Sequence, residues 1–310
     1  MPTRDEIRAA ARRIANRIRR TPILRLRGEE LRLSFPVTLK LEQLQVTGSF
    51  KPRGAFNRIL TAGDVPEAGV IAASGGNHGL AVAHAAKVLN LRAEIFVPEA
   101  TPQAKRQRIE AAGATLVVGG ASYDEARAAS ETRARETGAL VVHAYDQEAV
   151  LAGQGTIGLE MSEDAPDLTH VLVAVGGGGL YGGIASWYRD EMEVVPVEPD
   201  SCPTLTMAML MGRPASVPVG GVAADSLGAR MIGELALRVA RRGDTQVITV
   251  SDEAIRAAQR RLWEVARIVA EPGGACAFAA LLSGAWTPPP DARVGVVVCG
   301  ANCDPGMVAT

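Results

Sequence analysis

The sequence predicts an α/β protein of two doubly wound domains with mainly parallel sheets. From Val37 onward, short β-branched or apolar runs alternate with alanine-rich helical stretches, a pattern typical of parallel sheets with helices on both faces. The runs at 171–175 and 294–298 hold only apolar residues and glycine, as expected of strands buried on both faces. About nine strands are many for one sheet of this kind, so we expect two domains that meet at a cleft.

The individual elements follow from local signals. Thr3 and Glu6 form a T-x-x-E capping box, which predicts an N-terminal helix. The predicted strands are Val37–Leu41, Val70–Ala73, Ala93–Val97, Thr115–Val118, Ala139–His143, Val171–Val175, Val194–Val197, Gln246–Val250 and Val294–Val298. The later predicted helices are Phe56–Thr61, His78–Asn90, Pro102–Ala112, Tyr123–Thr137, Leu159–Glu163, Tyr181–Glu191, Ala229–Arg242, Asp252–Ile268 and Ala275–Leu282.

Charge and composition exclude several classes of function. The 310 residues carry 33 Lys and Arg against 34 Asp and Glu, a net charge of −1, whereas nucleic-acid binding rests on excess positive charge. Aromatic residues make up 4%, too few for base-stacking platforms. Four irregularly spaced cysteines and a charged first helix predict no disulfide framework, zinc site or signal segment. No apolar run reaches membrane-spanning length. We therefore expect a cytoplasmic protein with no nucleic-acid or membrane partner.

A run of four glycines predicts a phosphate site. Gly176, Gly177, Gly178 and Gly179 lie between the predicted strand at 171–175 and the helix predicted to start at Tyr181. Glycines let the backbone approach a ligand closely and point N–H groups at it. The N-terminus of the helix adds partial positive charge, and the combination forms a phosphate cradle.

The same segment also satisfies a dinucleotide-binding pattern. Gly177, Gly179 and Gly182 read G-x-G-x-x-G, and Glu198 ends the next predicted strand about 20 residues later. Taken alone, the segment is equally consistent with an NAD(P)-dependent oxidoreductase. The rest of the chain has to separate the two interpretations.

A second glycine loop follows the predicted strand that ends at Ala73. Ser74, Gly75, Asn77 and His78 belong to the sequence S-G-G-N-H-G at the start of a predicted helix. The loop offers a hydroxyl, an amide, an imidazole and backbone N–H groups, which suit a carboxylate or a phenolate oxygen.

Lys51 is the candidate for amine chemistry. It is one of only four lysines, and it alone is flanked by glycine, serine and an aromatic residue before a predicted helix. Lys40 lies in a predicted strand, and Lys87 and Lys105 lie on predicted helices. A lysine in a dry pocket has a lowered pKa and acts as a nucleophile or base.

Together these segments resemble the fold-type II pyridoxal 5′-phosphate enzymes of the serine/threonine dehydratase branch, which includes threonine ammonia-lyases and serine racemases. The matching segments come in the family's order and cover nearly the whole chain. They are G-S-F-K-P-R-G-A (48–55), S-G-G-N-H-G (74–79), A-G-Q-G-T-I-G-L-E (152–160), G-G-G-G-L (176–180), V-E-P (197–199), A-D-S-L-G (224–228), E-P-G-G-A (271–275) and C-G-A-N (299–302).

The resemblance implies a tryptophan-synthase-β-like fold, with a large cofactor-binding domain at 1–50 and 147–310 and a small domain at 51–146. It implies that Lys51 holds the cofactor as a Schiff base. The resemblance further implies that Phe50 packs near the cofactor ring, that Asn77 hydrogen-bonds the 3′-oxygen of the ring, and that the phosphate is bound by Gly176, Gly177, Gly178, Gly179 and Leu180. It implies that Cys299 faces the ring nitrogen and that Glu271 lies near that end of the ring. The substrate carboxylate would be bound by the loop of Ser74, Gly75, Asn77 and His78, and the loop Asp225–Gly228 would line the pocket.

The implied activity is the elimination of water from L-threonine or L-serine to give a 2-oxo acid and ammonia, in amino-acid catabolism. Serine racemases, which the chain also resembles, carry a second serine where this chain has Gly75. Glycine cannot move a proton, so we expect elimination rather than racemisation. Serine racemase activity and the dehydration of 3-hydroxyaspartate or phenylserine are the alternatives within the family.

Further properties also follow from the resemblance. Relatives with a structural cation use the glutamate of V-E-P, so Glu198 is a candidate ligand of a divalent cation. Thr204 stands where those relatives have an aspartate, although Asp200 lies nearby. The family is commonly homodimeric, and we expect a homodimer. The sequence ends at Thr310, so we expect no C-terminal regulatory domain.

Overall fold

The computed structural model describes residues 1–243 and 245–309, and Thr310 lies outside the described residues. The described chain builds two separate sheets. The larger has six strands in the order β1-β2-β10-β7-β8-β9. Its strands are β1 (Ile23–Leu26), β2 (Val37–Leu41), β7 (His170–Ala174), β8 (Glu193–Pro199), β9 (Ile248–Val250) and β10 (Val294–Val298).

The smaller sheet has four strands in the order β5-β4-β3-β6. They are β3 (Val70–Ala73), β4 (Ala93–Val97), β5 (Thr115–Val118) and β6 (Leu140–Val141). All neighbouring strands in both sheets are parallel except β1 and β2, which pair antiparallel at one edge. The predicted α/β class with mainly parallel sheets is therefore confirmed.

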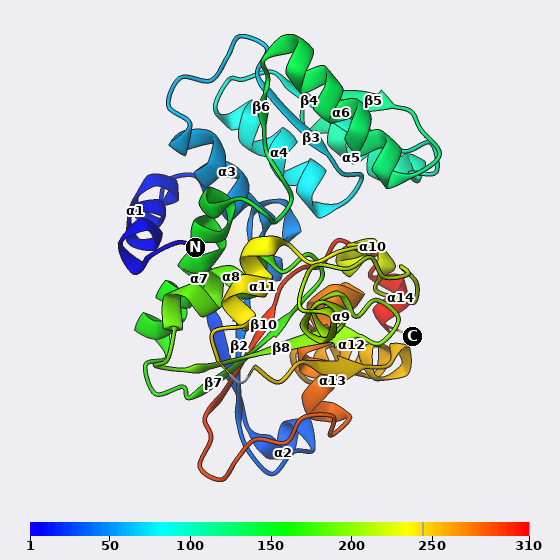
Figure 1. The fold of residues 1–310 in the computed structure, drawn as a ribbon. Coiled ribbons are helices and arrows are strands. Elements are labelled where there is room, and N and C mark those ends of the chain that lie inside the picture. Colours follow the sequence, from blue (N-terminus) through cyan, green and yellow to red (C-terminus); the bar gives the residue numbers. More distant parts are fainter. Residues whose placement is uncertain (244, 310) are drawn as a thin grey trace.

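Helices surround both sheets (Figure 1). They are α1 (Arg4–Ile14), α2 (Gly28–Leu31), α3 (Lys51–Thr61), α4 (Asn77–Val88), α5 (Gln103–Ala111), α6 (Tyr123–Thr137), α7 (Glu148–Asp164), α8 (Gly179–Tyr188), α9 (Thr204–Met211), α10 (Ala224–Leu227), α11 (Glu234–Ala240), α12 (Asp252–Ala266), α13 (Pro272–Leu282) and α14 (Gly306–Ala309). Two short 3-10 turns, η1 (Glu42–Leu44) and η2 (Val46–Gly48), connect β2 to α3. Among the described residues, no helix has both the length and the apolar character needed to cross a membrane.

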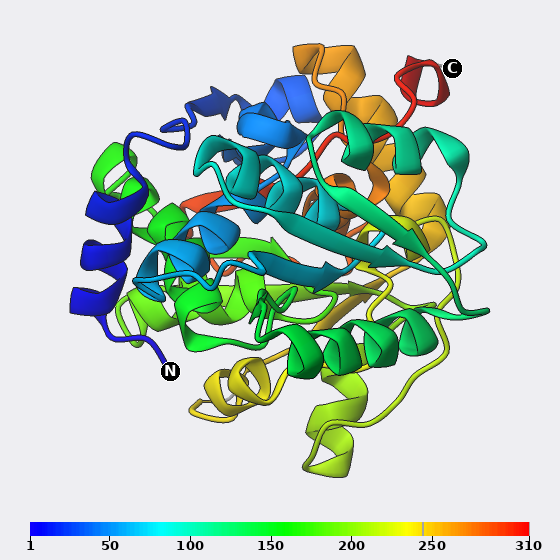
Figure 2. The ribbon, with the colours of Figure 1, turned by 90° about the horizontal axis from the view of Figure 1, so that it is seen from above.

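Each sheet packs into its own hydrophobic core. Ile95 and Phe56 lie fully buried in the core beside the four-stranded sheet, and Val173 and Phe278 lie in that of the six-stranded sheet. Figure 2 shows the smaller sheet lying over the larger one, with α1 along one flank. The predicted division at residues 51 and 147 stays a prediction; the smaller sheet draws its strands from residues 70–141 and the larger from 23–41 and 170–298.

Helix α7 differs most from its predicted extent of Leu159–Glu163, because it starts eleven residues earlier, at Glu148. The part that was not predicted, residues 148–158, contains three glycines, which suggest a loop when the sequence is taken alone. In the structure these glycines allow neighbouring chain segments to approach. A Cβ at Gly155 would lie 2.8 Å from the Gly183 carbonyl oxygen, and one at Gly158 would lie 3.1 Å from Trp187. A Cβ at Gly153 would collide with the Arg53 backbone.

Other boundaries also differ. The helix predicted at Phe56–Thr61 begins at Lys51, and the one predicted at Ala229–Arg242 covers only Glu234–Ala240. The strand predicted at Ala139–His143 shortens to two residues, because the chain then leaves the sheet edge to form the wall of the pocket described below. Strand β1 and helix α9 were not predicted. β1 is a short edge strand whose neighbour, rather than its own sequence pattern, defines it.

Candidate active site

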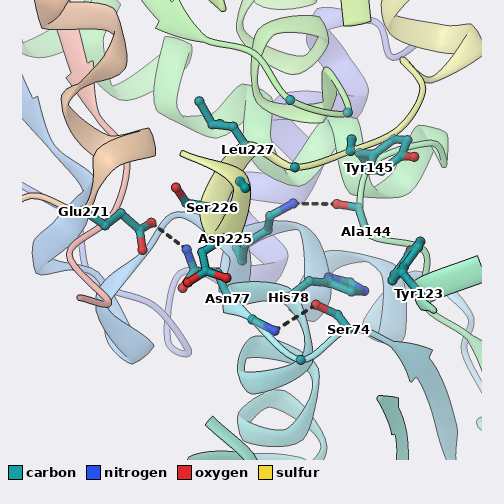
Figure 3. A pocket seen from close by; sticks show the side chains of 18 of the residues that line it. Ser74, Asn77, His78, Tyr123, Ala144, Tyr145, Asp225, Ser226, Leu227 and Glu271 are labelled. Atoms are coloured by element: carbon teal, nitrogen blue, oxygen red, sulfur yellow. Dashed lines mark hydrogen bonds between the residues drawn. The ribbon is translucent and has the colours of Figure 1, made fainter. Parts of the chain in front are cut away.

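A cavity of about 350 Å³ opens at the carboxyl ends of strands from both sheets (Figure 3). This is where doubly wound folds bind ligands. Except for Glu198, every residue given a site role in the sequence lines this cavity. The lining includes Phe50, Lys51, Ser74, Gly75, Asn77, His78, Gly176, Gly177, Gly178, Gly179, Leu180, Glu271 and Cys299. Segments separated by up to about 250 residues in the sequence therefore meet in one pocket.

Lys51 is the first residue of α3 and projects into the cavity. Pro52 follows it at the second helical position, where a proline favours helix initiation. Lys51 Nζ donates a hydrogen bond of 2.8 Å to the carbonyl oxygen of Ala144. Burial lowers the pKa of Lys51 from 10.5 to about 8, and the neighbouring carboxyl group of Glu271 opposes the shift only in part. A substantial share of this amine is therefore neutral near physiological pH, as a nucleophile or base requires.

A buried ion network fixes the start of α3. Arg53 is fully buried and donates two hydrogen bonds to Glu42, of 2.8 and 2.7 Å, and two to Glu160, of 2.7 and 2.9 Å. Lys40 Nζ donates to Glu160 at 2.6 Å. Burial alone would lower the pKa of Arg53, but the two carboxylates outweigh it and hold that pKa above its ordinary value. Because Arg53 lies two residues after Lys51, the network holds the helix that carries the amine.

The loop after β3 presents the start of α4 to the cavity. The N–H groups of a helix's first turn have no partner within the helix and attract anions. His78 Nε2 lies 2.8 Å from the Val142 carbonyl oxygen. Burial, with the charge of Lys51, lowers the pKa of His78 to about 3, so the ring is neutral and its Nε2 is the donor in this contact. The group that His78 offers an anion is therefore its backbone N–H rather than its imidazole.

Asn77 has fixed partners at both ends of its amide. Its Nδ2 donates to Glu271 Oε1 at 2.6 Å, and its Oδ1 accepts from Asn302 Nδ2 at 2.7 Å. Asn302 is itself held by the carbonyl oxygen of Thr47. Burial raises the pKa of Glu271 to about 7. Because Oδ1 is occupied, the remaining Nδ2–H is the group that Asn77 directs toward an acceptor in the pocket.

The glycine run after β7 forms a close-fitting backbone cradle at the start of α8. Gly178 has a φ of +85°, which favours glycine. A Cβ at Gly176 would lie 2.7 Å from the Leu227 carbonyl oxygen, and one at Gly177 would collide with the Tyr145 ring. Backbone N–H groups and the helix N-terminus together suit a phosphate.

Cys299 follows β10 and is buried in the cavity wall. Its Sγ donates to the Gly273 carbonyl oxygen at 3.3 Å. Burial, with the nearby Glu271 charge, raises the pKa of the Cys299 thiol far above its ordinary value. The group is therefore a protonated thiol rather than a thiolate nucleophile.

Glu198 lies outside the cavity and is fully buried at the start of α9. Its carboxylate accepts hydrogen bonds from the backbone N–H groups of Leu205 and Thr206, at 2.6 and 2.9 Å, and from the Thr206 hydroxyl at 2.9 Å. Thr204 Oγ1 lies 3.0 Å from Glu198 and 2.6 Å from the Gly176 carbonyl oxygen. Helix α9 therefore occupies the carboxylate oxygens that a cation or a ribose would need.

The contacts of Glu198 bear on the predicted divalent-cation site and on the dinucleotide interpretation. No group of three or more His, Cys, Asp or Glu residues in the described part of the chain could hold a metal ion. The residues around Glu198 therefore do not fit a divalent cation. They do not fit the dinucleotide interpretation either, because an acidic side chain with no exposed surface cannot reach ribose hydroxyls.

Several pocket residues were not predicted from the sequence. Thr101, Lys105, Tyr123 and Tyr145 also line the cavity. Thr101 follows β4 at the carboxyl edge of the smaller sheet, and this position is the one signal that the sequence offered. The other three reach the pocket through the packing of α5, α6 and the segment after β6.

Fold and cavity define a class: a doubly wound α/β enzyme with a lysine and a phosphate cradle in one pocket. A sequence model of the family described as "Pyridoxal-phosphate dependent enzyme" matches residues 14–300. The chain belongs to this family of pyridoxal-phosphate-dependent enzymes.

Individual relatives agree with this assignment. The chain is 34% identical over 312 residues to an L-threonine ammonia-lyase of Thermotoga maritima, covering 99% of this chain and 77% of the relative. The crystal structure of a threonine deaminase from T.th. superposes with a TM-score of 0.91 at 35% identity, covering 98% of this chain and 99% of that one. Maize serine racemase gives a TM-score of 0.90 at 30% identity, covering 99% and 95%.

The pocket fits the family's cofactor. Its aldehyde requires a neutral amine, which the lowered pKa of Lys51 makes available. Its phosphate requires closely placed backbone N–H groups, which the glycine run with its φ of +85° at Gly178 provides at the start of α8. Lys51, Asn77 and the glycines 176–179 are the residues that would hold it.

Proposed function

We propose that the protein is a lyase that eliminates water from L-threonine or L-serine and yields a 2-oxo acid and ammonia. The observation that carries the proposal is the meeting of Lys51, the N-terminus of α4 and the glycine cradle in one cavity of about 350 Å³. Such a cavity suits a small amino acid beside the cofactor. The names of relatives at 34–35% identity, an L-threonine ammonia-lyase and a threonine deaminase, support the same reaction.

The residues divide the work among binding, orientation and proton transfer. When bound, pyridoxal phosphate supplies an electron sink for charge that develops at the substrate Cα. The first-turn N–H groups of α4 bind the substrate carboxylate. Lys51 Nζ, in the neutral form that burial favours, takes the proton from Cα. Lys51 then passes this proton to the β-hydroxyl, which departs as water, and a second water molecule hydrolyses the released enamine to the 2-oxo acid and ammonia.

Gly75 has no side chain that could carry a proton, whereas serine racemases have a serine at this position. This difference favours elimination over racemisation. Serine racemase activity remains the second candidate because maize serine racemase shares the fold and 30% of the aligned sequence. The two activities differ in product, because racemisation yields D-serine and no ammonia.

The test measures ammonia and 2-oxo acid released from L-threonine and L-serine, with D-serine quantified in the same samples. The purified protein should absorb visible light and lose that absorption with borohydride. Lys51→Ala should abolish both activity and the borohydride-sensitive absorption. Lys87→Ala, at a surface lysine of α4, is the matched control and should change neither. A colourless protein that refuses added cofactor, or an active Lys51→Ala variant, would overturn the proposal.

Two further properties complete the proposal: a cytoplasmic location and a homodimeric state. All four cysteines are unpaired in the described structure, which supports a reducing compartment. The family resemblance supports the homodimer. Sedimentation of the purified protein at micromolar concentration tests the oligomeric state directly.

A further inference from the structure

The charges around the mouth of the pocket bear on which substrate side chains it accepts. Among the described residues that line the cavity, only Lys51 and Lys105 carry cationic side chains. Lys51 is the residue proposed to hold the cofactor. Within this cavity, Lys105 of α5 is therefore the remaining described cation that could receive a second carboxylate of a substrate.

Lys105 is already paired. Its Nζ lies 2.9 Å from Asp225 Oδ1, and this ion pair joins α5 to α10 across the mouth. Lys105 is 27% exposed and Asp225 is 79% exposed. Figure 3 shows Asp225 among the side chains that line the pocket. A second carboxylate of a substrate would therefore meet Asp225 wherever it approaches Lys105.

The segment that carries Asp225 is held in place from several sides. A Cβ at Gly76 would lie 3.5 Å from the Asp225 carbonyl oxygen, and the Ser226 hydroxyl accepts a hydrogen bond of 2.9 Å from the Gly273 backbone. A few residues later, Arg230 lies 3.6 Å from Asp124 of α6. Two ion pairs thus join residues 225–230 to helices α5 and α6, and this keeps the Asp225 carboxylate at the mouth.

The rest of the wall adds no positive charge. Tyr123, Tyr145 and Ala229 line the side toward α6, and the ring of His78 is neutral because its pKa is lowered to about 3. Glu271 contributes a second carboxyl group to the wall. The basic residue Arg127, one turn along α6, is paired with Glu131 at 2.9 Å and does not line the cavity.

We propose that the site selects hydroxy amino acids with an uncharged side chain, and that Asp225 determines this specificity by neutralising Lys105. The inference rests on the proposed function and narrows it: it favours threonine and serine over 3-hydroxyaspartate. A second carboxylate would lose water on entering the mouth and would find a like charge instead of a free cation. The lost hydration and the like charge together should lower kcat/KM for such a substrate at least about 100-fold.

Ammonia release gives one assay for both substrates. Wild-type enzyme should show a kcat/KM for 3-hydroxyaspartate at least about 100-fold below that for L-threonine. Asp225→Asn leaves Lys105 without its charged partner. It should raise kcat/KM for 3-hydroxyaspartate relative to that for threonine about tenfold, because Lys105 can then donate a charge-assisted hydrogen bond to the second carboxylate. Adding Lys105→Met to Asp225→Asn should cancel the gain, since the released cation is then absent.

Glu131→Gln is the matched control. It releases Arg127 from another solvent-exposed ion pair, one that lies outside the cavity, and it should leave the ratio of the two kcat/KM values unchanged. The inference would be overturned if the wild-type kcat/KM values for 3-hydroxyaspartate and L-threonine lay within tenfold of each other. It would also be overturned if Glu131→Gln raised the relative kcat/KM for 3-hydroxyaspartate as much as Asp225→Asn does.

A failure of this specificity inference can be distinguished from a failure of the proposed function. If the wild type releases no ammonia from any hydroxy amino acid, the proposed function fails. The specificity is then measured through the binding of unreactive L-alanine and L-aspartate, detected as a change in absorption of the cofactor-loaded enzyme. Alanine should bind the wild type more tightly than aspartate, and Asp225→Asn should narrow the difference; equal binding of both by the wild type would contradict the inference.

Discussion

The side-chain amide of Asn77 donates a hydrogen bond of 2.6 Å to the carboxyl group of Glu271. Asn302 holds the other end of the same amide. The pair therefore couples the orientation of Asn77 to a carboxyl group that is itself buried. Because Glu271 gains no cationic hydrogen-bond donor in exchange for water, burial raises its pKa from 4.5 to about 7.

A pH-dependent stability follows for Glu271. Because its folded-state pKa lies above the ordinary value, its contribution is fully present below about pH 4.5 and is lost as the pH rises through 7. We therefore expect Glu271→Gln to gain stability over the wild type, by up to about 3 kcal/mol, between pH 5 and pH 8. Denaturant melts of both proteins at the two pH values measure this gap. The same substitution at the exposed Glu264 is the control; a Glu271→Gln gap that does not change with pH would contradict the prediction.

The lowered pKa of Lys51 predicts how the cofactor-free protein takes up pyridoxal phosphate. With a pKa of about 8, about one tenth of the amine is neutral at pH 7, far more than for an ordinary lysine. The uptake rate should rise roughly tenfold per pH unit up to about pH 8 and then level off. Stopped-flow absorbance between pH 6.5 and 9.5 tests this. A rate that keeps rising to pH 9.5 would mean that burial does not depress the pKa of this amine.

The contact between Gly75 and Thr101 predicts the outcome of installing a serine at position 75. A Cβ there would lie 2.8 Å from Thr101 Cγ2 and 3.1 Å from its Oγ1, tighter than van der Waals contact allows. Gly75→Ser alone should lower elimination at least tenfold without producing D-serine. Gly75→Ser combined with Thr101→Ala should recover turnover and form D-serine, measured by chiral chromatography. D-serine formation by the single variant would show that Thr101 is no obstacle.

The buried network around Arg53 predicts a large loss of stability when it is broken. Arg53→Met leaves the buried Glu42 without its main partner, and such losses cost about 3–5 kcal/mol. Arg133→Met is the control, because Arg133 also donates two 2.9 Å hydrogen bonds to one carboxylate, Glu94, but on the surface. That variant should lose far less stability than Arg53→Met, because water screens an exposed ion pair. Thermal melts compare the two, and equal losses would refute a special role for the buried network.

The contacts of Glu198 predict independence from divalent cations. Helix α9 saturates this carboxylate with hydrogen bonds, so dialysis against EDTA should change neither the melting temperature nor the activity. Thr206→Val removes one of the donors and should destabilise the protein by about 1 kcal/mol. Restoration of lost activity by Mg²⁺ or Ca²⁺ after EDTA treatment would contradict this account.

Those parts of the fold whose signals are local could be predicted from the sequence. β2, β3, β4, β5 and β10 have their predicted bounds because each is a short run rich in apolar or β-branched residues between turn or helix signals. Residues 148–158 of α7 could not be predicted, because their glycines are explained by contacts with α3 and α8 that no local window contains. β1 depends in the same way on pairing with β2.

The site residues also divide into those with a local sequence signal and those that depend on tertiary contacts. Lys51, Asn77 and the glycines 176–179 could be found because each belongs to a short motif between a strand and a helix. Thr101 offered only its position after β4, and Lys105 and Tyr145 belong to no such motif and reach the cavity through tertiary packing alone. The pairing of Lys105 with Asp225 joins residues 120 positions apart in the sequence, which single-sequence patterns do not encode.

The three glycines of α7 affect how inactive variants should be interpreted. None of the residues of this helix lines the cavity, yet added side-chain atoms at Gly153, Gly155 or Gly158 would push against other chain segments. A mutational scan scored only by turnover would mark these positions as essential and place them beside the chemistry. Measuring the yield of folded protein for each variant would separate this intolerance to bulk from true participation in the reaction.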